Sequence, residues 1–437
     1  MRDLLVAFIV FGALPFVLAR PFLGILLLAG LGYMNPHRLC YGFMLSMPVV
    51  QIVALFTLLG MLMSKEAKRM VWSREVVVLV IFIVWMGITT SQALYFSAAI
   101  EQYEKVIKIQ ILTFMTLLLL TSRERVHLLV WAIVCSIGFY GVKGGIFTIV
   151  KGGVHRVQGP PGTFIEGNNE LALAMVMTIP LMRYLHLTEK HKLIRLGLAV
   201  GMVLTAIAAF GTQSRGALVA LSLTGAIFWL KSRNKIMTGL LITTAALIAL
   251  SIMPAEWFER MNTIKTYGED ASALGRINAW WTAFNLANDR IWGGGFETWR
   301  PAVFQAYAPD PNNVRDVHSV YFEVLGEHGW IGLTIFLTLL GLSWLKCSRV
   351  IRMAKKQPDM TWARDLAAMI QVTFVAYLSA GAFLGLAYFD YIYHLVATIV
   401  VLHTFVPSVV VGRATSPQGV AGPPLTLGLA LGKLRRG

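Results

Sequence analysis

Long apolar runs alternate with short polar connections along most of the 437-residue chain. A run of about 18–20 apolar residues can cross a bilayer as a helix. A first apolar segment covers residues 4–34. Eleven further runs follow at roughly 43–63, 76–95, 106–121, 127–149, 168–187, 196–212, 216–231, 236–253, 329–346, 365–388 and 391–411. The runs are continuous rather than alternating, which predicts an all-α polytopic membrane protein and not a β-barrel.

The first segment leaves the number of crossings open. The apolar stretch after Arg2 resembles a signal peptide, but Ala19-Arg20-Pro21 is a poor cleavage site, so we expect an uncleaved membrane helix. Proline disfavours helix at the residue before it, so residues 4–34 are either one broken crossing or two short helices. One crossing predicts about twelve transmembrane helices with both termini cytoplasmic, whereas two crossings predict thirteen with the N-terminus outside.

Basic clusters recur at every second connection and predict the sides of the membrane. If the C-terminal tail is cytoplasmic, the cytoplasmic segments hold 24 of the 38 Lys and Arg residues and 7 of the 22 acidic residues. This is the positive-inside distribution of a multi-pass protein of the bacterial inner membrane. It accounts for the formal net charge of +16 without a nucleic-acid partner. Overall, 57% of residues are hydrophobic and only 14% are charged, well below the charged fraction of soluble domains.

One outer connection is much longer than the others. The pattern divides the chain into N-terminal transmembrane helices (1–253), a large periplasmic loop (254–328), C-terminal transmembrane helices (329–412) and a cytoplasmic tail (413–437). Within the loop, apolar residues recur at helical spacing from Ser272 to Asn288, which predicts an amphipathic helix. Three glycines at 293–295 predict a turn or a close approach of backbone. A new helix is expected to start near Asp316 or Val317.

His318 would then lie in the first turn of that helix. The positive end of the helix dipole disfavours imidazolium, so the ring is expected to stay neutral and able to accept a proton. A neutral histidine beside a hydroxyl is the commonest general base. The alternative is a structural histidine that binds a carbonyl and helps to pack the loop.

Outer arginines are the candidate anion-binding groups. Arg215 lies in the shortest outer turn, where Ser214 could cap the following helix, and the alternative is an arginine that snorkels to the interface. Arg276 can bind a phosphate in bidentate geometry, or it can pair with Glu269 or Asp270. Arg156 and Asn169 flank another outer connection, where hydrogen bonds between helices are the alternative.

No sequence pattern indicates a metal or nucleotide cofactor. The outer segments contain no Asp-x-Asp pair, no His-x-x-x-His pair and no P-loop, and Cys40, Cys135 and Cys347 have no metal-binding spacing. We therefore expect no metal, no cofactor and arginines as the groups that neutralise any bound diphosphate.

These residues resemble the O-antigen ligase/polymerase superfamily of bacterial integral membrane glycosyltransferases. The resemblance rests on Arg156…Gly162-Thr163-Phe164…Asn169-Glu170-Leu171-Ala172, on Gln213-Ser214-Arg215-Gly216-Ala217, and on Gly275-Arg276…Trp280, Gly293-Gly294-Gly295-Phe296, His318-Ser319-Val320-Tyr321 and Gly329-Trp330-Ile331-Gly332. It covers most of residues 140–345. Ser319 departs from the family, in which Asn frequently follows the histidine.

The resemblance implies a fold, a reaction and site residues. The fold is that of a GT-C-type glycosyltransferase. The reaction is an inverting, metal-independent transfer of O-antigen glycan from undecaprenyl diphosphate to a sugar hydroxyl of lipid A–core, on the periplasmic face. His318 would deprotonate the acceptor, and Arg215 and Arg276 would hold the diphosphate. Arg156, Asn169 and Tyr321 would be further substrate contacts.

Other functions stay open. O-antigen polymerases and ligases that transfer oligosaccharide to protein share the superfamily, and an exosortase-associated O-ligase has a similar pattern. A transporter of lipid-linked oligosaccharide is the alternative from another class, but internal repeats and paired ionisable groups along several helices, which would favour it, are not evident.

Overall fold

The structure is a computed structural model that describes residues 1–66, 70–232, 234–262 and 271–414. Across these residues the secondary structure is helical, with no β-strand. Eight segments are long and apolar enough to cross a membrane: α1 (Arg2–Ala19), α4 (Arg74–Ser91), α6 (Arg123–Val150), α7 (Asn168–Thr188), α8 (Lys192–Gly211), α10 (Lys235–Ile252), α14 (Val320–Ala354) and Pro358–Phe383, which contains α15 (Thr361–Ala380). The predicted all-helical, polytopic class is confirmed.

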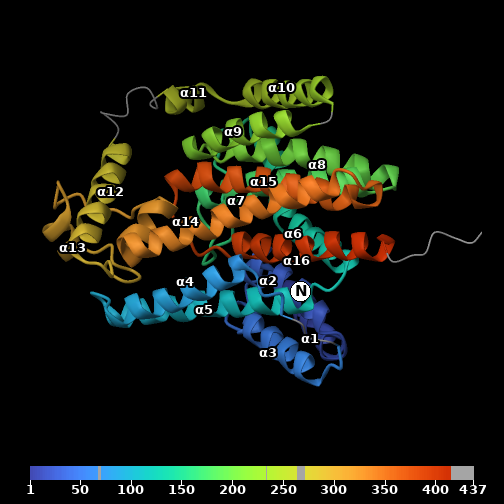
Figure 1. The fold of residues 1–437 in the computed structure, drawn as a ribbon. Coiled ribbons are helices and arrows are strands. Elements are labelled where there is room, and N and C mark those ends of the chain that lie inside the picture. Colours follow the sequence, from blue (N-terminus) through green and yellow to red (C-terminus); the bar gives the residue numbers. More distant parts are fainter. Residues whose placement is uncertain (67–69, 233, 263–270, 415–437) are drawn as a thin grey trace, which may run out of the picture.

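Further helices complete the bundle and its outer part. The remaining α-helices are α2 (Pro21–Tyr33), α3 (Val49–Met63), α5 (Phe96–Leu119), α9 (Arg215–Lys231), α11 (Ala255–Asn262), α12 (Ala271–Asp289), α13 (Pro301–Tyr307) and α16 (Asp390–Ala414). Four 3₁₀ turns are η1 (Pro36–Leu39), η2 (Phe43–Leu45), η3 (Pro358–Met360) and η4 (Gly381–Phe383). In Figure 1, α12 and α13 project from one end of the bundle, beside the start of α14.

Helix α7 forms the centre of the bundle and packs against α6, α8, α9 and α15. Most of its side chains from Leu171 to Leu185 are buried, although its composition is no more apolar than that of its neighbours. In contrast, most side chains of α10 are exposed, and its main contacts are with α8 and α9. Helix α10 is therefore peripheral, and its outer surface would face lipid.

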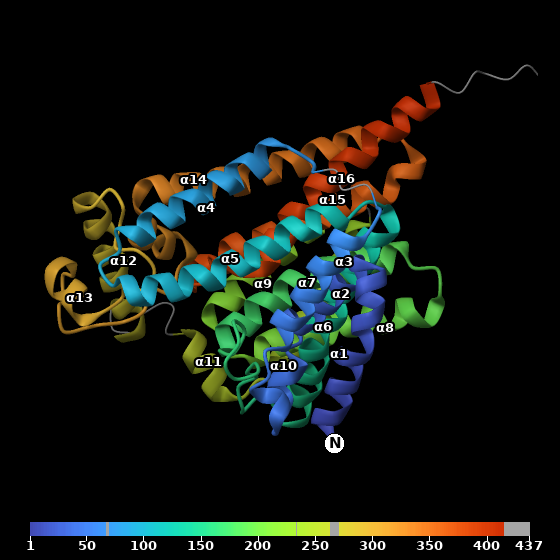
Figure 2. The same cartoon turned by 90° about the horizontal axis from the view of Figure 1, so that it is seen from below.

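The first apolar segment forms two helices that fold back on each other. The helix breaks at Arg20, and Pro21 begins α2, where its missing N–H costs nothing. The backbone N–H groups of Gly42 and Met44, which follow α2, donate to Asp3 Oδ1 at 3.0 and 3.2 Å. The start of α1 and the end of α2 thus lie at the same end of the bundle, opposite the end of α16 (Figure 2). Two helices that fold back on each other are what the thirteen-helix alternative requires, and the number of crossings stays a prediction.

Two helix boundaries differ from the hydropathy pattern. Helix α5 begins at Phe96, so residues 96–105 are helical and not the outer connection that we predicted. Their charged residues interrupt the apolar run but favour helix, and Glu104 pairs with Lys108 one turn later at 3.9 Å. Helix α15 ends at Ala380, and a largely buried connection of residues 381–389 follows, although the apolar run predicted at 365–388 continues through most of it. A hydropathy scale cannot distinguish an apolar connection of this kind from an apolar helix.

Candidate functional site

Helix α12 holds the chain segment that leads into α14. The amphipathic helix predicted at 272–288 is present as Ala271–Asp289. Asn278 clamps the loop, since its Nδ2 donates to the carbonyls of Asp310 and Asn313 at 2.8 and 3.1 Å and its Oδ1 accepts from Asp310 N–H at 2.8 Å. One face of α12 therefore fixes the irregular segment predicted at 309–313.

Trp280 extends this clamp to the residue before His318. Its Nε1 donates to the Val317 carbonyl at 2.9 Å, and its ring stacks on Phe322 with centroids 5.1 Å apart. Arg276 is half-buried one turn earlier on the same helix, and a Cβ on its neighbour Gly275 would lie 2.4 Å from Arg315 Cδ. Arg276 is thus beside the segment that carries His318. Its predicted alternative partners, Glu269 and Asp270, lie outside the described residues.

His318 lies just outside the helix rather than in its first turn. Helix α14 begins at Val320 with Ser319 as its N-cap, so the predicted start near Asp316 or Val317 is wrong by about one turn. His318 has a left-handed backbone with φ of 43°, a conformation that costs a non-glycine residue free energy and often marks functional sites. Its side chain is 38% exposed, so the imidazole is partly accessible at the surface of the protein.

Asp316 orients the imidazole. One carboxylate oxygen accepts from Val317 N–H at 2.9 Å, and the other lies 3.3 Å from His318 Nδ1. A carboxylate at Nδ1 favours the proton on that nitrogen, which leaves Nε2 as the proton acceptor. A general base and its orienting group would need an arrangement of this kind.

The three glycines at 293–295 connect the loop to a break in α14. Gly329 interrupts that helix with φ of 66° and ψ of −174°, so nearby carbonyls lose their helical partners. Gly294 N–H and Gly295 N–H donate to the carbonyls of Gly326 and Glu327 at 2.8 and 2.9 Å, and Trp85 Nε1 donates to the His328 carbonyl at 2.9 Å. The predicted close approach of backbone is confirmed, and it satisfies the carbonyls that the break exposes.

A second group of cations surrounds the turn between α8 and α9. Gln213 has φ of 55°, and Ser214 caps α9 by accepting from Ala217 N–H at 3.2 Å, as predicted. Arg215 is the first residue of α9. Arg156 Nε donates to Gln213 Oε1 at 3.3 Å, and Arg260 Nε donates to the Gln213 carbonyl at 3.0 Å. Three arginines therefore lie at the positive end of one helix, which is a site suited to an anion.

The outer connection before α7 docks on the same turn. Val157 N–H donates to the Gly211 carbonyl at 3.0 Å, and Asn168 Nδ2 donates to the Thr212 carbonyl at 2.8 Å. Asn168 therefore makes this contact, whereas the predicted substrate contact Asn169 is half-buried one residue further into α7. A Cβ on Gly162 would lie 3.6 Å from Arg38 Nη1, which brings a fourth arginine to this connection.

The η4 turn lies between the two groups. A Cβ on Gly216 would lie 3.2 Å from Phe383 Cβ, and a Cβ on Gly381 would lie 2.9 Å from Val320 Cγ2. The first residues of α9 and α14 thus pack against opposite ends of one short turn. Tyr321, a predicted substrate contact, donates its hydroxyl to the Leu378 carbonyl at 2.7 Å and so fixes α14 to α15. Its role in the structure is to position the start of α14.

Nothing among the described residues gathers three His, Cys, Asp or Glu side chains in a way that could hold a metal ion. The groups that converge are guanidinium donors, a helix N-terminus and one Asp–His pair. Guanidinium groups bind phosphate and carboxylate, so the donor set fits an anionic substrate.

Two comparisons with protein families bear on this site. Residues 1–190 match a family of unknown function (DUF5935). Residues 200–337 match the O-antigen ligase family. No match to a curated protein was found. The O-antigen ligase match contains Arg215, Arg276 and His318, and it supports the O-antigen ligase/polymerase superfamily and a ligase/polymerase-type membrane glycosyltransferase.

Sequence reasoning missed three groups within the O-antigen ligase region. Arg260 is 47 residues from the turn that it contacts, and no local spacing indicates that approach. Asp316 was considered only as a possible helix start, although its position two residues before His318 was a usable signal. Glu323 was also overlooked, and its carboxylate accepts from Ala387 N–H at 3.1 Å and fixes the connection after η4.

Proposed function

We propose that this protein is a periplasmic-face O-antigen ligase. It transfers O-antigen polysaccharide from undecaprenyl diphosphate to a sugar hydroxyl of lipid A–core, in the bacterial inner membrane. The observation that carries the proposal is that α9, which begins at Arg215 in the arginine-rich Gln213 turn, and α14, which follows the Asp316–His318 pair, pack against the two ends of η4.

The arginines form the donor diphosphate site in this proposal. Arg215 and Arg260 flank the N-terminus of α9, and Arg156 approaches from the connection before α7. Their charges and the helix dipole stabilise the negative charge that develops on the departing diphosphate. Arg276 supplies a further guanidinium from α12, and Asn169 is a second-rank contact. These cations perform the neutralisation that a divalent metal performs in other transferases.

His318 acts as the general base. The acceptor hydroxyl oxygen attacks the anomeric carbon of the donor sugar, and His318 Nε2 takes the hydroxyl proton. The bond from that carbon to the diphosphate oxygen breaks on the opposite face, so configuration inverts and undecaprenyl diphosphate leaves. Asp316 stabilises the imidazolium that forms. Trp280 holds the backbone next to His318 and so fixes its position.

The sides of the membrane follow from the charge distribution. We infer that the arginine turn, α12, α13 and His318 face the periplasm, because the basic clusters between the other helix ends favour the cytoplasm. The two-helix form of residues 4–34 then places the N-terminus on the periplasmic side and the C-terminus in the cytoplasm. Cysteine accessibility to an impermeant reagent at residues 3 and 359 of the full chain tests this assignment.

Analysis of the reaction products distinguishes the proposed ligase from a polymerase, a protein oligosaccharyltransferase and a transporter. Purified full-length protein is incubated with undecaprenyl-diphosphate glycan, with and without lipid A–core. The proposal predicts a glycan–lipid A–core product that forms only when lipid A–core is present. Longer undecaprenyl-linked chains without lipid A–core would instead show a polymerase. Glycan on an added acceptor protein would show a protein oligosaccharyltransferase. Movement of intact donor across a vesicle bilayer, with no transfer, would show a transporter.

A further inference from the structure

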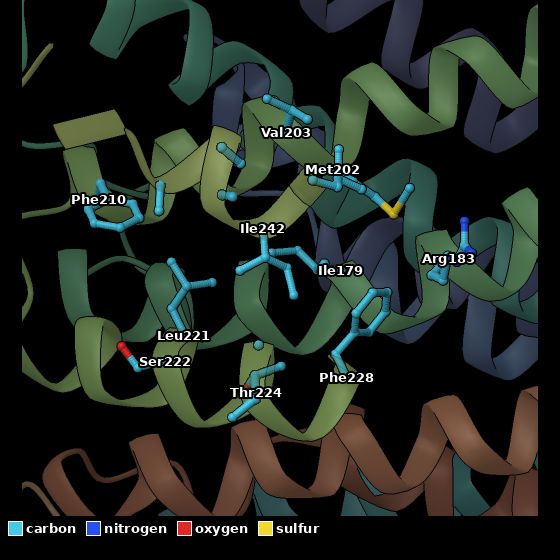
Figure 3. Close-up of a pocket in the computed structure, with 16 residues that line it drawn as sticks. Ile179, Arg183, Met202, Val203, Phe210, Leu221, Ser222, Thr224, Phe228 and Ile242 are labelled. Atoms are coloured by element: carbon cyan, nitrogen blue, oxygen red, sulfur yellow. The ribbon is translucent and has the colours of Figure 1, made fainter. Parts of the chain in front are cut away.

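An apolar cavity separates α10 from the rest of the bundle. Its volume is 220 Å³, far more than the roughly 10–15 Å³ that one water molecule needs. Side chains from α7, α8, α9 and α10 line it, among them Ile179, Met202, Leu221 and Ile242. Figure 3 shows Phe210 at one end of this cavity and Arg183 at the other. A cavity with this lining gives water few partners and suits a hydrocarbon chain.

One polar atom that faces the cavity has no partner. Thr224 is 3% exposed, and its hydroxyl oxygen makes no hydrogen bond to any described residue. A threonine hydroxyl within a helix can donate to the carbonyl four residues earlier, as those of Thr178 and Thr148 do in this bundle. An unpaired hydroxyl in an apolar cavity costs free energy unless a ligand group accepts from it. This atom is therefore an independent indication that the cavity holds a ligand with an acceptor.

A charged chamber adjoins the cavity at Arg183 and Phe228, which line both spaces. Lys231, Ser232 and Asp365 complete this chamber, whose volume is 70 Å³. Arg183 Nη1 contacts His186 Nδ1 at 3.1 Å, and Lys231 Nζ donates to Gln371 Oε1 at 2.7 Å. Asp365 pairs with Arg364 at 3.3 Å. Arg364 thus balances the charge of the Asp365 carboxylate. The positive charges of Arg183 and Lys231 favour an anion in the chamber.

We propose that this cavity binds an anionic glycerophospholipid, with one acyl chain between α10 and the bundle and the phosphate beside Arg183 and Lys231. Thr224 donates to an acyl ester carbonyl. The lipid fills the space under α10, a helix whose apolar span is only 11% buried by protein. It therefore joins α10 to α8 and α9. The phosphate end of the site lies where α7 ends and α8 begins, and the apolar end reaches Phe210, close to the Gln213 turn. The site does not depend on the proposed transferase activity.

Native mass spectrometry of the full-length protein tests this site. Delipidated protein is titrated with phosphatidylglycerol or with phosphatidylcholine of the same chains. We expect phosphatidylglycerol to bind at least about fivefold more tightly, since one cation near a membrane surface contributes a factor of that order for an anionic lipid. Arg183→Gln and Lys231→Gln each remove about that factor. Lys192→Gln, an exposed cation at the same end of the bundle, leaves binding unchanged.

A second pair of variants tests the acyl chain. Ala245→Phe fills the cavity from α10, and we expect it to abolish tight binding of phosphatidylglycerol. Leu247→Phe adds similar bulk to an exposed position of the same helix and should have no effect. Equal binding of the two lipids, or equal effects within either matched pair, would overturn the proposal. A polyprenyl phosphate that displaces phosphatidylglycerol at lower concentration would also overturn it, because the occupant would then be a donor lipid.

Discussion

Gly295 is a position where one added methyl group should disturb the packing of the segment around α12 and the start of α14. A Cβ there would lie 2.3 Å from Ala93 Cβ and 2.8 Å from Ala93 Cα, in the turn between α4 and α5. The backbone of Gly295 has φ of 78°. Its N–H donates to the Glu327 carbonyl, and the neighbouring Gly294 carbonyl accepts from Leu94 N–H at 2.8 Å. Gly295→Ala must therefore strain the backbone or separate two packed segments.

The expected loss of stability is the sum of three costs. A left-handed backbone costs an alanine about 1–2 kcal/mol. Overpacking against the Ala93 backbone costs about 1–3 kcal/mol, because backbone atoms cannot rotate away. Weakening the hydrogen bond to Glu327 costs about 1 kcal/mol. We expect Gly295→Ala to reduce the free energy of unfolding by about 3–6 kcal/mol, with the α4–α5 hairpin released from α14.

Two glycine variants separate these costs. Gly152 has φ of 59° with no atom within 4 Å of an added Cβ, so Gly152→Ala carries only the backbone cost. Gly341 lies within α14 and is equally open, so Gly341→Ala should stabilise the helix by about 0.5–1 kcal/mol. Thermal unfolding of the full chain in detergent, followed by tryptophan fluorescence, should rank Gly341→Ala first, then wild type, Gly152→Ala and Gly295→Ala. The reasoning is refuted if Gly295→Ala and Gly152→Ala unfold at the same temperature.

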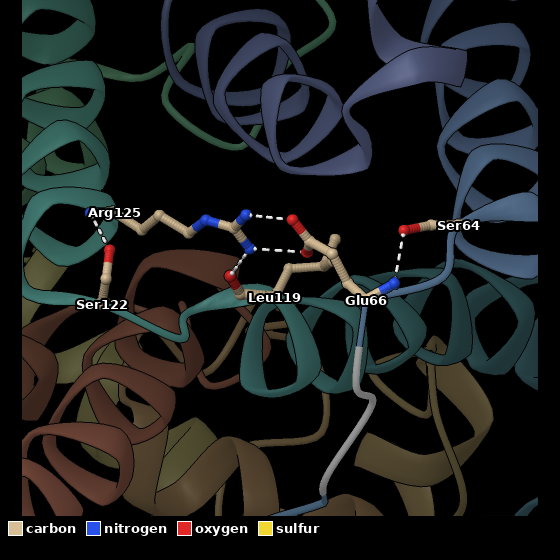
Figure 4. Close-up of polar contacts among 5 residues, drawn as sticks. All are labelled: Ser64, Glu66, Leu119, Ser122 and Arg125. Carbon is tan, nitrogen blue, oxygen red and sulfur yellow. Dashed lines mark hydrogen bonds and ion pairs between the residues drawn. The ribbon is translucent and has the colours of Figure 1, made fainter.

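Three further predictions concern the site and the opposite end of the bundle. Asp316→Ala should lower kcat about fivefold with KM unchanged, because the pair with His318 is partly exposed, and Asp316→Glu should restore part of the rate; a change in KM alone would count against the orienting role. Arg260→Gln should raise KM for the undecaprenyl-diphosphate donor more than KM for the acceptor, and steady-state kinetics with each substrate varied would detect the reverse. Glu66 accepts two hydrogen bonds from Arg125, at 3.0 and 2.5 Å (Figure 4), which lower the pKa of its carboxyl. Because the pKa of Glu66 is lower in the folded protein, its ionised carboxyl stabilises the fold at pH values above the ordinary pKa of 4.5. This stabilisation is lost as the pH falls through the pKa of the folded state. Glu66→Gln should therefore cost less than about 1 kcal/mol near neutral pH and nothing in acid, as unfolding at the two pH values will show.

Much of the architecture could be predicted from the sequence because lipid imposes strong rules. Apolar length and basic clusters indicated a polytopic helical protein, and helical spacing indicated α12. Local rules also succeeded: Ser214 caps α9, and the glycines at 293–295 make a close backbone approach. Each of these features has a signal in a short stretch of sequence, although the glycines approach residues 32 positions later in the chain.

The failures share a different cause. The start of α14 was misplaced because a long-range hydrogen bond from Trp280 holds Val317 in an extended segment. The approach of Arg260 to Gln213 depends on how α11 packs after α10. The buried connection after Ala380 is apolar, so hydropathy cannot separate it from helix. Tertiary contacts decide each case, and a single sequence does not display them.

The placement of the site residues also refines their roles. Tyr321 is committed to the Leu378 carbonyl, so we expect it to act on the position of α14 and not directly on substrate. Asn168, rather than Asn169, ties the start of α7 to the Gln213 turn. The candidate site is therefore smaller than the set of motif residues, and its chemistry depends on His318 with Asp316 and on the arginines.

The rate of glycan transfer by a matched pair of variants tests the central claim most directly. Purified wild-type protein, His318→Ala and His155→Ala are compared with undecaprenyl-diphosphate glycan and lipid A–core in the presence of EDTA. His155 lies in the connection before α7 and serves as the control for loss of an outer histidine. We predict that wild type and His155→Ala transfer glycan at similar rates with the chelator present, whereas His318→Ala is slower by about 10²–10⁴-fold. Full activity of His318→Ala, or loss of wild-type activity in EDTA, would contradict the proposed mechanism.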